Sequence, residues 1–207
     1  MEYDNKKAIV KNPPIPRNYG TEFLVIEQGD GVYVKDTAGK EYLDFGSGIA
    51  VNALGYGRDD LAKTAYEQMK KLVHISNLFT TPQALGLAEK LVKTGNFSSV
   101  HFGNSGSEAN EAALKYARVY SQRVKGAGHH KFLCFEHAFH GRTMGALSCT
   151  PKAVYQEPFA PLIPGVEVAP YNDSKALARV LDRSFAAVIV EVIQGEGGLE
   201  AMTPEFA

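Results

Sequence analysis

A small, hydroxyl-rich turn precedes a long predicted helix and contains the groups that an anion site needs. Its residues are Gly103, Asn104, Ser105, Gly106 and Ser107. Glycine lets backbone amides approach a ligand closely, and the first turn of a helix has N–H groups with no acceptor inside the helix. Together with the helix dipole and the serine hydroxyls, these donors suit a phosphate dianion. The same residues could equally form an ordinary helix cap, with Ser105 or Ser107 as the N-cap.

A second segment, residues 135–143, combines groups that recognise a planar ring and a carboxylate. It reads Phe-Glu-His-Ala-Phe-His-Gly-Arg-Thr. The Arg142 guanidinium can donate two parallel hydrogen bonds to a carboxylate, and the Phe139 ring can stack on a planar ligand. His137 and His140 have a spacing that also occurs in metal sites. Because no cysteine or further histidine cluster accompanies them, we prefer a loop with solvated histidines to a metal site.

Two glutamates and a glutamine follow the most apolar segment of the chain. Glu191 lies near the end of the predicted strand 186–192, and Gln194 and Glu196 lie in the glycine-rich stretch beyond it. Ligands of parallel α/β sheets bind at the carboxyl ends of the strands, which makes Glu191 a candidate ligand contact. Taken alone, the segment is more typical of a solvated loop in which Glu191 accepts a hydrogen bond from a backbone amide.

The elements that must position these residues change in character near residue 100. Before it, short strand candidates separated by glycine turns predict a small antiparallel meander, and two helices follow. The strands are 23–27, 32–36 and 41–44, and the helices are 59–72, with Leu61, Ala65, Met69 and Leu72 facing inward, and 82–93.

After residue 100, strand candidates alternate with helices, which predicts an α/β domain with a largely parallel sheet. The strands are 100–102, 131–135, 146–149, 166–169 and 186–192, and the helices are 106–122 and 174–183. The strand 186–192 is apolar enough to be covered on both faces. One apolar face of helix 106–122 is predicted to contain Ala109, Ala112, Ala113, Tyr116, Ala117 and Tyr120.

Composition restricts the class of protein. The 207 residues have a formal net charge of −1, so no basic field favours nucleic acid or an anionic membrane as a partner. No apolar run approaches the ~20 residues of a membrane span, and the first residues have no hydrophobic signal core. Cys134 and Cys149 lie in apolar surroundings and are expected to be buried, reduced thiols. These features predict a cytoplasmic protein.

Three motifs in this order resemble those of class III pyridoxal-phosphate aminotransferases of fold type I, close to the acetylornithine aminotransferase branch. They are Asn-Ser-Gly-Ser-Glu-Ala-Asn-Glu at 104–111, Ala-Phe-His-Gly-Arg at 138–142 and Glu-Val-Ile-Gln-Gly-Glu-Gly-Gly at 191–198. Residues 43–55 and 74–79 support the branch. The resemblance covers the N-terminal half of such enzymes. It implies pyridoxal 5'-phosphate as the cofactor, a homodimer, and a mostly parallel sheet with flanking helices plus the small meander.

The resemblance also implies roles for individual residues. Ser105, Gly106 and Ser107 would bind the cofactor phosphate, Phe139 would stack on the pyridine ring, and His140 and Glu191 would line the same site, with Glu191 near the ring hydroxyl. Arg142 would bind the substrate α-carboxylate. Glu196 would pair with a later arginine, so that one pocket accepts both an ω-amine donor and 2-oxoglutarate. Tyr56, Ser107 and Val192 depart from the usual family residues, but none of these changes removes a group with an assigned role.

The implied reaction is transfer of the δ-amino group of N-acetylornithine to 2-oxoglutarate, which gives glutamate in arginine biosynthesis. Ornithine, succinylornithine and 4-aminobutyrate are alternative donors, because Arg142 selects a carboxylate and little more. In the family, the Schiff-base lysine and the acid that protonates the pyridine nitrogen lie beyond the position of Ala207. We therefore expect no catalytic residue in this chain and no transamination by the chain alone.

The resemblance suggests a domain organisation. Residues 1–20, marked by Pro13, Pro14 and Pro16, would form an N-terminal arm, and 21–72 a meander and helix of the small domain. Residues 73–207 would be the first part of the large, incomplete cofactor-binding domain. Residues 203–205 have the pattern of a helix start just before the last residue, so we expect a truncated protein.

Two other classes remain as alternatives. A strand, a glycine-rich turn and a helix also describe half of a nucleotide-binding oxidoreductase. The turn at 103–107 lacks the G-x-G-x-x-G order, however, and no acid ends a second strand about 20 residues further on. The third possibility is a non-catalytic fragment that binds phosphate or assembles with another chain.

Overall fold

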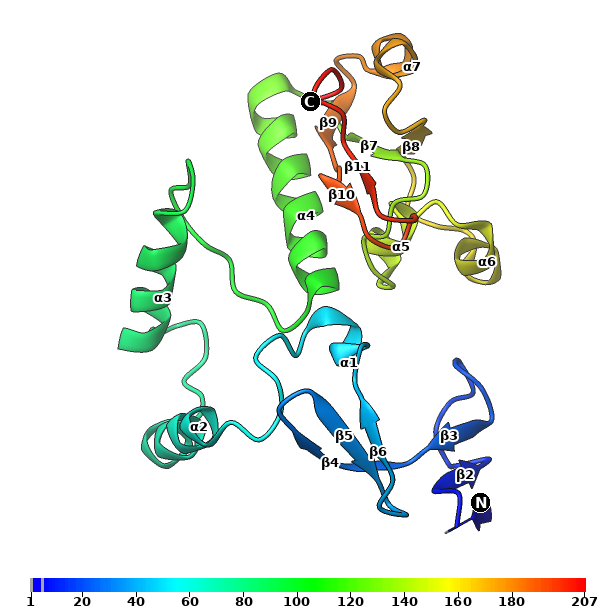
Figure 1. Cartoon of the computed structure of the whole chain (residues 1–207). Coiled ribbons are helices and arrows are strands. Elements are labelled where there is room, and N and C mark those ends of the chain that lie inside the picture. The colour runs from blue at the N-terminus through cyan, green and yellow to red at the C-terminus, as the bar shows by residue number, and fades with distance from the viewer. Residues whose placement is uncertain (1, 5) are drawn as a thin grey trace. The chain divides into compact units, whose positions relative to one another are not determined.

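A computed structural model describes residues 2–4 and 6–207 (Figure 1). Met1 and Asn5, both in the predicted arm, lie outside the described residues. The chain divides into two compact units, residues 1–82 and residues 83–207. Among the described residues, no helix combines the length and the apolar character needed to cross a bilayer.

The first unit begins with an antiparallel sheet of three short strands, β1 (Glu2–Asp4), β2 (Ile9–Lys11) and β3 (Glu22–Leu24). The sequence predicts neither β1 nor β2. The prolines of the predicted arm lie in the connection between β2 and β3. Because this stretch is polar and rich in proline, the sequence pattern gives no sign of the short strand β2 that precedes it.

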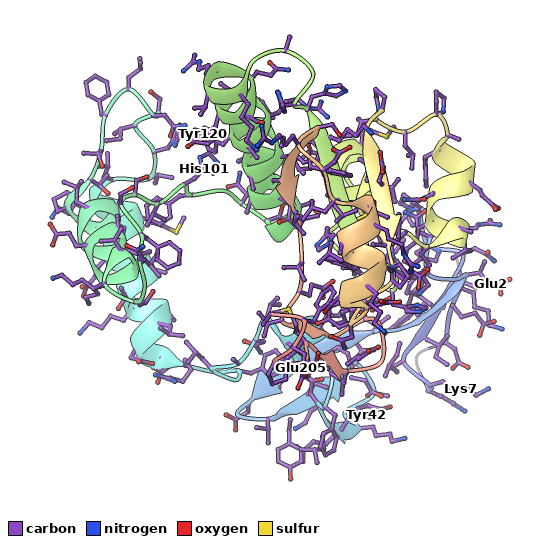
Figure 2. The ribbon with its side chains drawn as sticks, turned by 90° about the horizontal axis from the view of Figure 1, so that it is seen from above. Glu2, Lys7, Tyr42, His101, Tyr120 and Glu205 are labelled. Atoms are coloured by element: carbon purple, nitrogen blue, oxygen red, sulfur yellow. The ribbon has the colours of Figure 1, made fainter. Side chains whose placement is uncertain are left out.

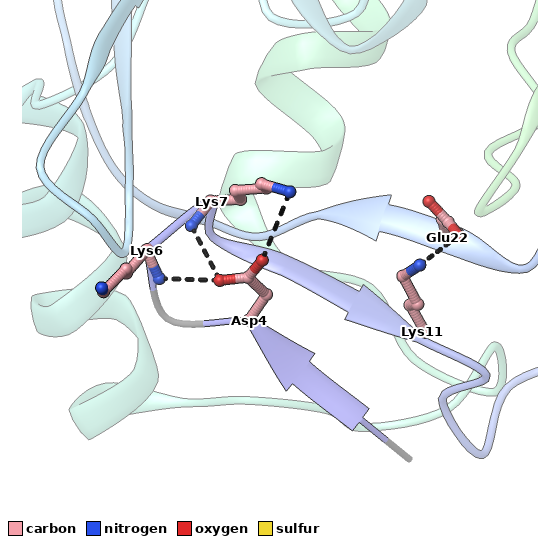
Figure 3. A network of polar contacts seen from close by, with 5 residues as sticks. All are labelled: Asp4, Lys6, Lys7, Lys11 and Glu22. Atoms are coloured by element: carbon pink, nitrogen blue, oxygen red, sulfur yellow. Dashed lines mark hydrogen bonds and ion pairs between the residues drawn. The ribbon is translucent and has the colours of Figure 1, made fainter.

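Polar contacts fix this sheet at two places (Figure 3). Asp4 Oδ1 accepts hydrogen bonds from the backbone N–H groups of Lys6 and Lys7 at 3.0 and 3.3 Å, which closes the turn after β1. Lys11 Nζ lies 2.9 Å from Glu22 Oε1 across β2 and β3. Because both side chains are about half exposed, this ion pair contributes little to stability.

The predicted antiparallel meander is present as β4 (Ile26–Asp30), β5 (Tyr33–Asp36) and β6 (Glu41–Leu43). The predicted strand 23–27 is wrong in its extent, because its residues are divided between β3 and β4. Asp36 organises the turn from β5 to β6 by accepting hydrogen bonds from the N–H groups of Ala38 and Lys40 and from the hydroxyl of Tyr42. Burial opposes ionisation of Asp36, but these hydrogen bonds outweigh it and lower the pKa of the carboxyl below its usual value.

Two helices follow in the first unit, α1 (Ser47–Ala50) and α2 (Asp59–Lys71). The α2 helix agrees with the prediction, and its terminal Asp59, Asp60, Lys70 and Lys71 complement the helix dipole. The predicted inward face of α2 is wrong, since no residue of this helix is buried. An amphipathic face is buried only against a partner, and α2 makes no extensive contact with another described element.

The second unit contains the parallel sheet that the sequence predicts. Its strands are β7 (Lys131–Phe135), β8 (Val166–Ala169) and β9 (Phe185–Val188), in the order β8-β7-β9, and both pairings are parallel. The α4 helix (Gly106–Lys125) covers one face and α7 (Ser174–Val180) the other (Figure 1). Alternate residues of β7 point to opposite faces, with Phe132 and Cys134 toward α4 and Leu133 and Phe135 toward α7.

Two strand predictions are wrong. Residues 100–102 form no strand, because none of the described strands pairs with them. Residues 146–149 belong largely to a helix, α5 (Met144–Ser148). A short apolar run cannot be assigned to a strand or a buried helix from periodicity alone. The predicted strand 186–192 and helix 174–183 are shorter than expected, and Val188 and Val190 of the former are exposed, so it is not covered on both faces.

The buried face of α4 agrees with the predicted one at Ala117 but differs from it at the two tyrosines. Leu114, Ala117 and Ser121 face the core, whereas Tyr116 and Tyr120 are exposed, Tyr120 by 65% (Figure 2). Many small residues on α4 create two overlapping stripes with helical spacing. The sequence pattern favours the stripe that contains Tyr116 and Tyr120, but the sheet packs against the stripe that contains Leu114.

The remaining elements are α3 (Pro82–Val92), which matches its prediction, α6 (Ala153–Gln156), the 3-10 helix η1 (Glu157–Phe159), and the antiparallel pair β10 (Ile193–Gln194) and β11 (Glu200–Ala201). Cys134 and Cys149 are free, buried thiols, as predicted. The hydrogen bond with Cys149 and burial both raise the pKa of Cys134, so this thiol stays protonated.

Candidate functional site

The carboxyl ends of β7 and β9 bring two of the predicted motifs together. Residues 136–143 leave the end of β7, and Glu191 follows β9, which runs parallel to it. The backbone N–H of Phe139 donates a hydrogen bond to Glu191 Oε1 at 2.7 Å. Glu191 therefore accepts from a backbone amide, which is the role predicted for it when the segment is considered alone, and in doing so it fixes the backbone that carries the Phe139 ring.

The start of α4 is capped by its own residues. Ser105 is the N-cap, and its hydroxyl accepts from the N–H of Glu108 at 3.2 Å. The Glu108 carboxylate accepts from the backbone N–H of Asn104 at 2.6 Å. Hydrogen bonds from the Asn104 side chain and backbone lower the pKa of Glu108. This reciprocal arrangement resembles a capping box, so the cap interpretation is correct for Ser105.

The next two residues of α4 remain available to a ligand. Apart from its two chain neighbours and the backbone of α4 itself, no atom of the described residues lies within 4 Å of the position that a Cβ on Gly106 would occupy. The hydrogen bonds of the described residues at this end of α4 begin at the N–H groups of Glu108 and Ala109, and none is donated by the backbone N–H of Gly106 or Ser107, as expected for the first turn of a helix. Of the donors that the sequence predicts for an anion, the backbone N–H groups of these two residues are therefore the ones open to a ligand.

The first turns of α4 also hold the loop that follows β7. Ser107 Oγ accepts from the N–H of Arg142 at 3.4 Å, and Asn110 Nδ2 donates to the His140 carbonyl at 2.6 Å. Gly141 has φ of +127°, and a Cβ there would collide with the Ser107 hydroxyl, so the contact requires glycine. The predicted phosphate turn and the predicted ring and carboxylate residues are therefore neighbours in space.

His140 lies inside this junction and is not a solvated loop residue. It is 6% exposed, and its backbone N–H donates to Thr150 Oγ1 at 2.9 Å. Its Nε2 is buried and has no partner among the described residues. Burial lowers the pKa of His140, against the smaller opposing effect of the Glu191 charge, so the imidazole is neutral near pH 7.

Sequence reasoning missed two residues beside Phe139 and Arg142. Tyr155 lies on α6, and the Arg142 guanidinium carbon is 4.3 Å from the centroid of its ring. Lys152 Nζ lies 3.6 Å from Glu196 Oε1. The only sequence signal is the spacing of Lys152 and Tyr155 on one side of a single helical turn, which is too common to identify a site.

Gln194 fixes the glycine-rich stretch that contains Glu196. Its side chain is fully buried and donates from Nε2 to the Glu136 carbonyl at 2.9 Å, whereas its Oε1 has no partner among the described residues. The sequence places Gln194 in a solvated loop, and this is wrong. Tyr171 donates to the Glu191 carbonyl at 2.8 Å and holds the start of the same stretch.

These positions fit a phosphorylated planar molecule with a carboxylate beside it. The open donors at Gly106 and Ser107 suit the phosphate, the partly buried Phe139 ring suits the planar group, and no carboxylate of the described residues pairs with Arg142. No group of three or more potential metal ligands gathers anywhere in the described part of the chain.

The fold and this arrangement define an α/β protein whose strand ends can receive such a phosphorylated molecule. Residues 15–207 match the family of class III aminotransferases, and the chain belongs to this family. The resemblance inferred from the three motifs is thereby confirmed, and with it pyridoxal phosphate as the cofactor of the family.

Curated relatives and solved structures agree with this assignment. The chain is 46% identical over 185 residues to a probable mitochondrial acetylornithine aminotransferase of Dictyostelium discoideum, and 45% identical over 192 residues to the acetylornithine aminotransferase of Archaeoglobus fulgidus. The matches cover 88% and 93% of this chain but 41% and 50% of the relatives, so the chain spans about half their length.

The ornithine aminotransferase of Toxoplasma gondii matches the structure with a TM-score of 0.85 and 30% identity, over 93% of this chain and 46% of that one. It is described with pyridoxal phosphate at partial occupancy in its active site. The chain therefore has the fold of pyridoxal-phosphate-dependent transaminases, fold type I, as the sequence predicts.

Proposed function

We propose that this chain forms the cofactor-phosphate and substrate-carboxylate part of a pyridoxal-phosphate-dependent transaminase. The observation that carries the proposal is the junction between α4 and the loop after β7, where Ser107 Oγ accepts from the N–H of Arg142 at 3.4 Å. Because this junction brings the two segments together, one small molecule could place its phosphate at the start of α4 and stack its planar ring on Phe139.

The chain's own residues would bind and orient the cofactor. The N–H groups of Gly106 and Ser107, with the Ser107 hydroxyl, would bind the phosphate, and Phe139 would lie on the pyridine ring. Glu191 fixes the Phe139 backbone, and Asn110 and Thr150 hold the backbone of His140, whose imidazole burial keeps neutral. Pyridoxal phosphate supplies the conjugated ring that withdraws electrons from the substrate carbon.

Arg142 and Glu196 would define the substrates. Arg142 would bind a carboxylate through two parallel hydrogen bonds. Glu196 would pair with an arginine outside these residues, so that one pocket accepts both the ω-amine donor and 2-oxoglutarate. N-acetylornithine would be the donor and 2-oxoglutarate the acceptor, in arginine biosynthesis. The curated relatives are named acetylornithine aminotransferases, and these names support acetylornithine as the donor. Ornithine, succinylornithine and 4-aminobutyrate are the alternative donors, and ornithine is the substrate named for the Toxoplasma protein.

The proposal also includes the chain's surroundings. We expect a homodimer and a cytoplasmic location, although several fungal relatives are described as mitochondrial. The lysine that binds the cofactor covalently is expected outside these 207 residues. The purified chain should therefore show no turnover of N-acetylornithine with 2-oxoglutarate, and turnover would contradict this part of the proposal.

Pyridoxine 5'-phosphate provides the direct test, because it has the phosphate and the ring but no aldehyde that could react with surface lysines. We expect the chain to bind it in isothermal titration calorimetry, and Phe139→Ala to weaken binding about tenfold through lost stacking. Phe159→Ala, an exposed phenylalanine of η1, is the matched control. Equal affinities of both variants and the wild type, or binding of NAD in place of pyridoxine 5'-phosphate, would refute the proposal.

A further inference from the structure

A cluster of aromatic and charged side chains connects Arg142 to Glu196, and Tyr155 is at its centre. The Arg142 guanidinium carbon and Lys152 Nζ lie 4.3 and 4.7 Å from the centroid of the Tyr155 ring. The Tyr155 hydroxyl donates to Glu196 Oε1 at 3.3 Å. Phe139 meets the same ring edge-to-face, with 6.5 Å between the centroids. One tyrosine thus contacts both Arg142 and Glu196, the two residues proposed to define the substrates.

Lys152 is the counter-ion of Glu196 within this chain. Its Nζ lies 3.6 Å from the Oε1 that Tyr155 also contacts, and each of the two charged side chains is 48% exposed. Solvent screens such a pair, so a charged ligand can rearrange it. Among the described residues, no carboxylate pairs with the Arg142 guanidinium, and Glu196 instead contacts Lys152 and Tyr155. The two parallel donors of Arg142 are therefore open to a ligand.

The cluster borders a hollow of about 90 Å³ lined by Phe139, Thr150, Lys152 and Glu196 among others. Lys152 and Glu196 line the hollow and supply one positive and one negative charge. Arg142 does not line it, but supplies a second positive charge against the Tyr155 ring. Without Lys152, the Glu196 carboxylate would repel the second carboxylate of a ligand already bound to Arg142. With Lys152 in place, that repulsion is compensated.

We propose that Lys152, with Tyr155, is a positioning residue that holds Glu196 and thereby favours dicarboxylate over monocarboxylate ligands beside Arg142. This inference rests on the proposed function and names the residues that tune its substrate class. Lys152 acts through Glu196 and not by direct contact with the ligand. Action through Glu196 and direct contact with the ligand predict different results for a variant in which both Lys152 and Glu196 are replaced.

The test compares glutarate with pentanoate, which have the same carbon chain but two carboxylates and one. Their affinities for the full chain are measured by ligand-observed NMR. Lys152→Gln should lower the ratio of the glutarate to the pentanoate association constant about threefold, the effect expected for a half-exposed ion pair. Lys152→Arg should retain the ratio. Lys175→Gln, an exposed lysine of α7, is the matched control and should leave it unchanged.

The Glu196→Gln background separates the two roles of Lys152. If Lys152 acts through Glu196, adding Lys152→Gln to Glu196→Gln leaves the ratio unchanged. A threefold fall that persists in this background shows direct contact and overturns the proposal. So does an unchanged ratio in the single Lys152→Gln variant whose circular dichroism matches the wild type, or the absence of glutarate binding at millimolar concentrations.

A separate titration with pyridoxine 5'-phosphate distinguishes this inference from the proposed function. Lys152→Gln should bind pyridoxine 5'-phosphate as tightly as the wild type, because Lys152 contacts neither Ser107 nor the start of α4 in the described interactions. Failure of the wild type to bind it refutes the proposed function, while the carboxylate ratio, measured without this ligand, still decides the role of Lys152.

Discussion

At the scale of single residues, the site depends on buried polar groups whose surroundings the sequence does not reveal. His140 is the clearest case. It sits between the start of α4 and the loop after β7, where Asn110 holds its carbonyl and Thr150 holds its N–H. A protonated imidazole in this position would be a buried charge with no carboxylate in direct contact, so the folded chain keeps it neutral.

This neutrality predicts a pH dependence of stability. The pKa of His140 is lower in the folded chain than the ~6.5 of an unfolded histidine, so the unfolded state binds more protons as the pH falls below ~6.5. The free energy of unfolding should therefore decrease between about pH 7 and about pH 5, by at most ~1.4 kcal/mol per pH unit from this residue. His140→Asn should lose this part of the slope in urea titrations.

The control for that measurement is His74→Asn, because His74 is exposed and lies in the other unit. The control should retain the slope of the wild type. Identical slopes for the wild type and His140→Asn would show that the burial of His140 does not determine its protonation.

Residue type alone identified some of the site. An arginine and a phenylalanine beside a glycine, in a loop that follows a strand, indicate carboxylate binding and ring stacking. Arg142 and Phe139 can therefore be identified from the sequence. Lys152, Tyr155 and Gln194 cannot, because lysine and glutamine are mostly exposed and tyrosine occurs both in cores and on surfaces. Their roles depend on contacts between residues distant in the chain, such as the bond from Gln194 to the Glu136 carbonyl.

At the scale of elements, α5 shows how a distant carboxylate can decide between strand and helix. Glu111 on α4 accepts hydrogen bonds from the N–H groups of Gly145 and Ala146 at 2.7 and 3.2 Å. Both amides lie in the first turn of α5, where they have no acceptor within the helix. The apolar run at 146–149 fits a strand as well as a helix. The charge on a neighbouring helix favours the helix, and no local pattern contains that information.

Replacement of Glu111 should therefore destabilise the second unit. Glu111→Ala leaves two buried amides without an acceptor, and we expect a loss of about 1–3 kcal/mol in the free energy of unfolding, measured with urea. Glu111→Gln retains an acceptor without the charge and should lose less. Glu89→Ala, on the exposed side of α3, is the control and should change stability by less than about 0.5 kcal/mol. If Glu111→Ala behaves like this control, Glu111 does not determine the start of α5.

At the scale of the whole molecule, the sequence predicts the architecture better than the local details. The alternation of strands and helices after residue 100 is sufficient for a parallel sheet, and β7, β8 and β9 confirm it. Residues 100–102 fail as a strand because a strand exists only through its partners, which a local pattern does not specify. The predicted inward face of α2 is wrong for the same reason. An amphipathic pattern indicates a face that can be buried, but it does not specify the element against which that face packs.

The two units also differ in how much apolar surface they bury. Every large hydrophobic side chain that is buried, from Leu114 to Phe185, belongs to residues 83–207, while the first unit buries only Ala8 and Asp36 among its described residues. Since burial of apolar surface is the main source of folding stability, the two units should open with different free energies. Hydrogen exchange measured by mass spectrometry should find the slowest amides in β7 and much faster exchange in β4, β5 and β6.

A core substitution makes this last prediction specific. Phe132 is 2% exposed and lies on β7 between β8 and β9, so Phe132→Ala should remove about 3–5 kcal/mol from the second unit. Exchange in β7 should accelerate strongly in this variant, whereas exchange in β4, β5 and β6 should stay as it is, because those strands already open without unfolding of the parallel sheet. Slow exchange of the meander in the wild type, or its acceleration together with β7 in Phe132→Ala, would instead mean that both units unfold as one cooperative structure.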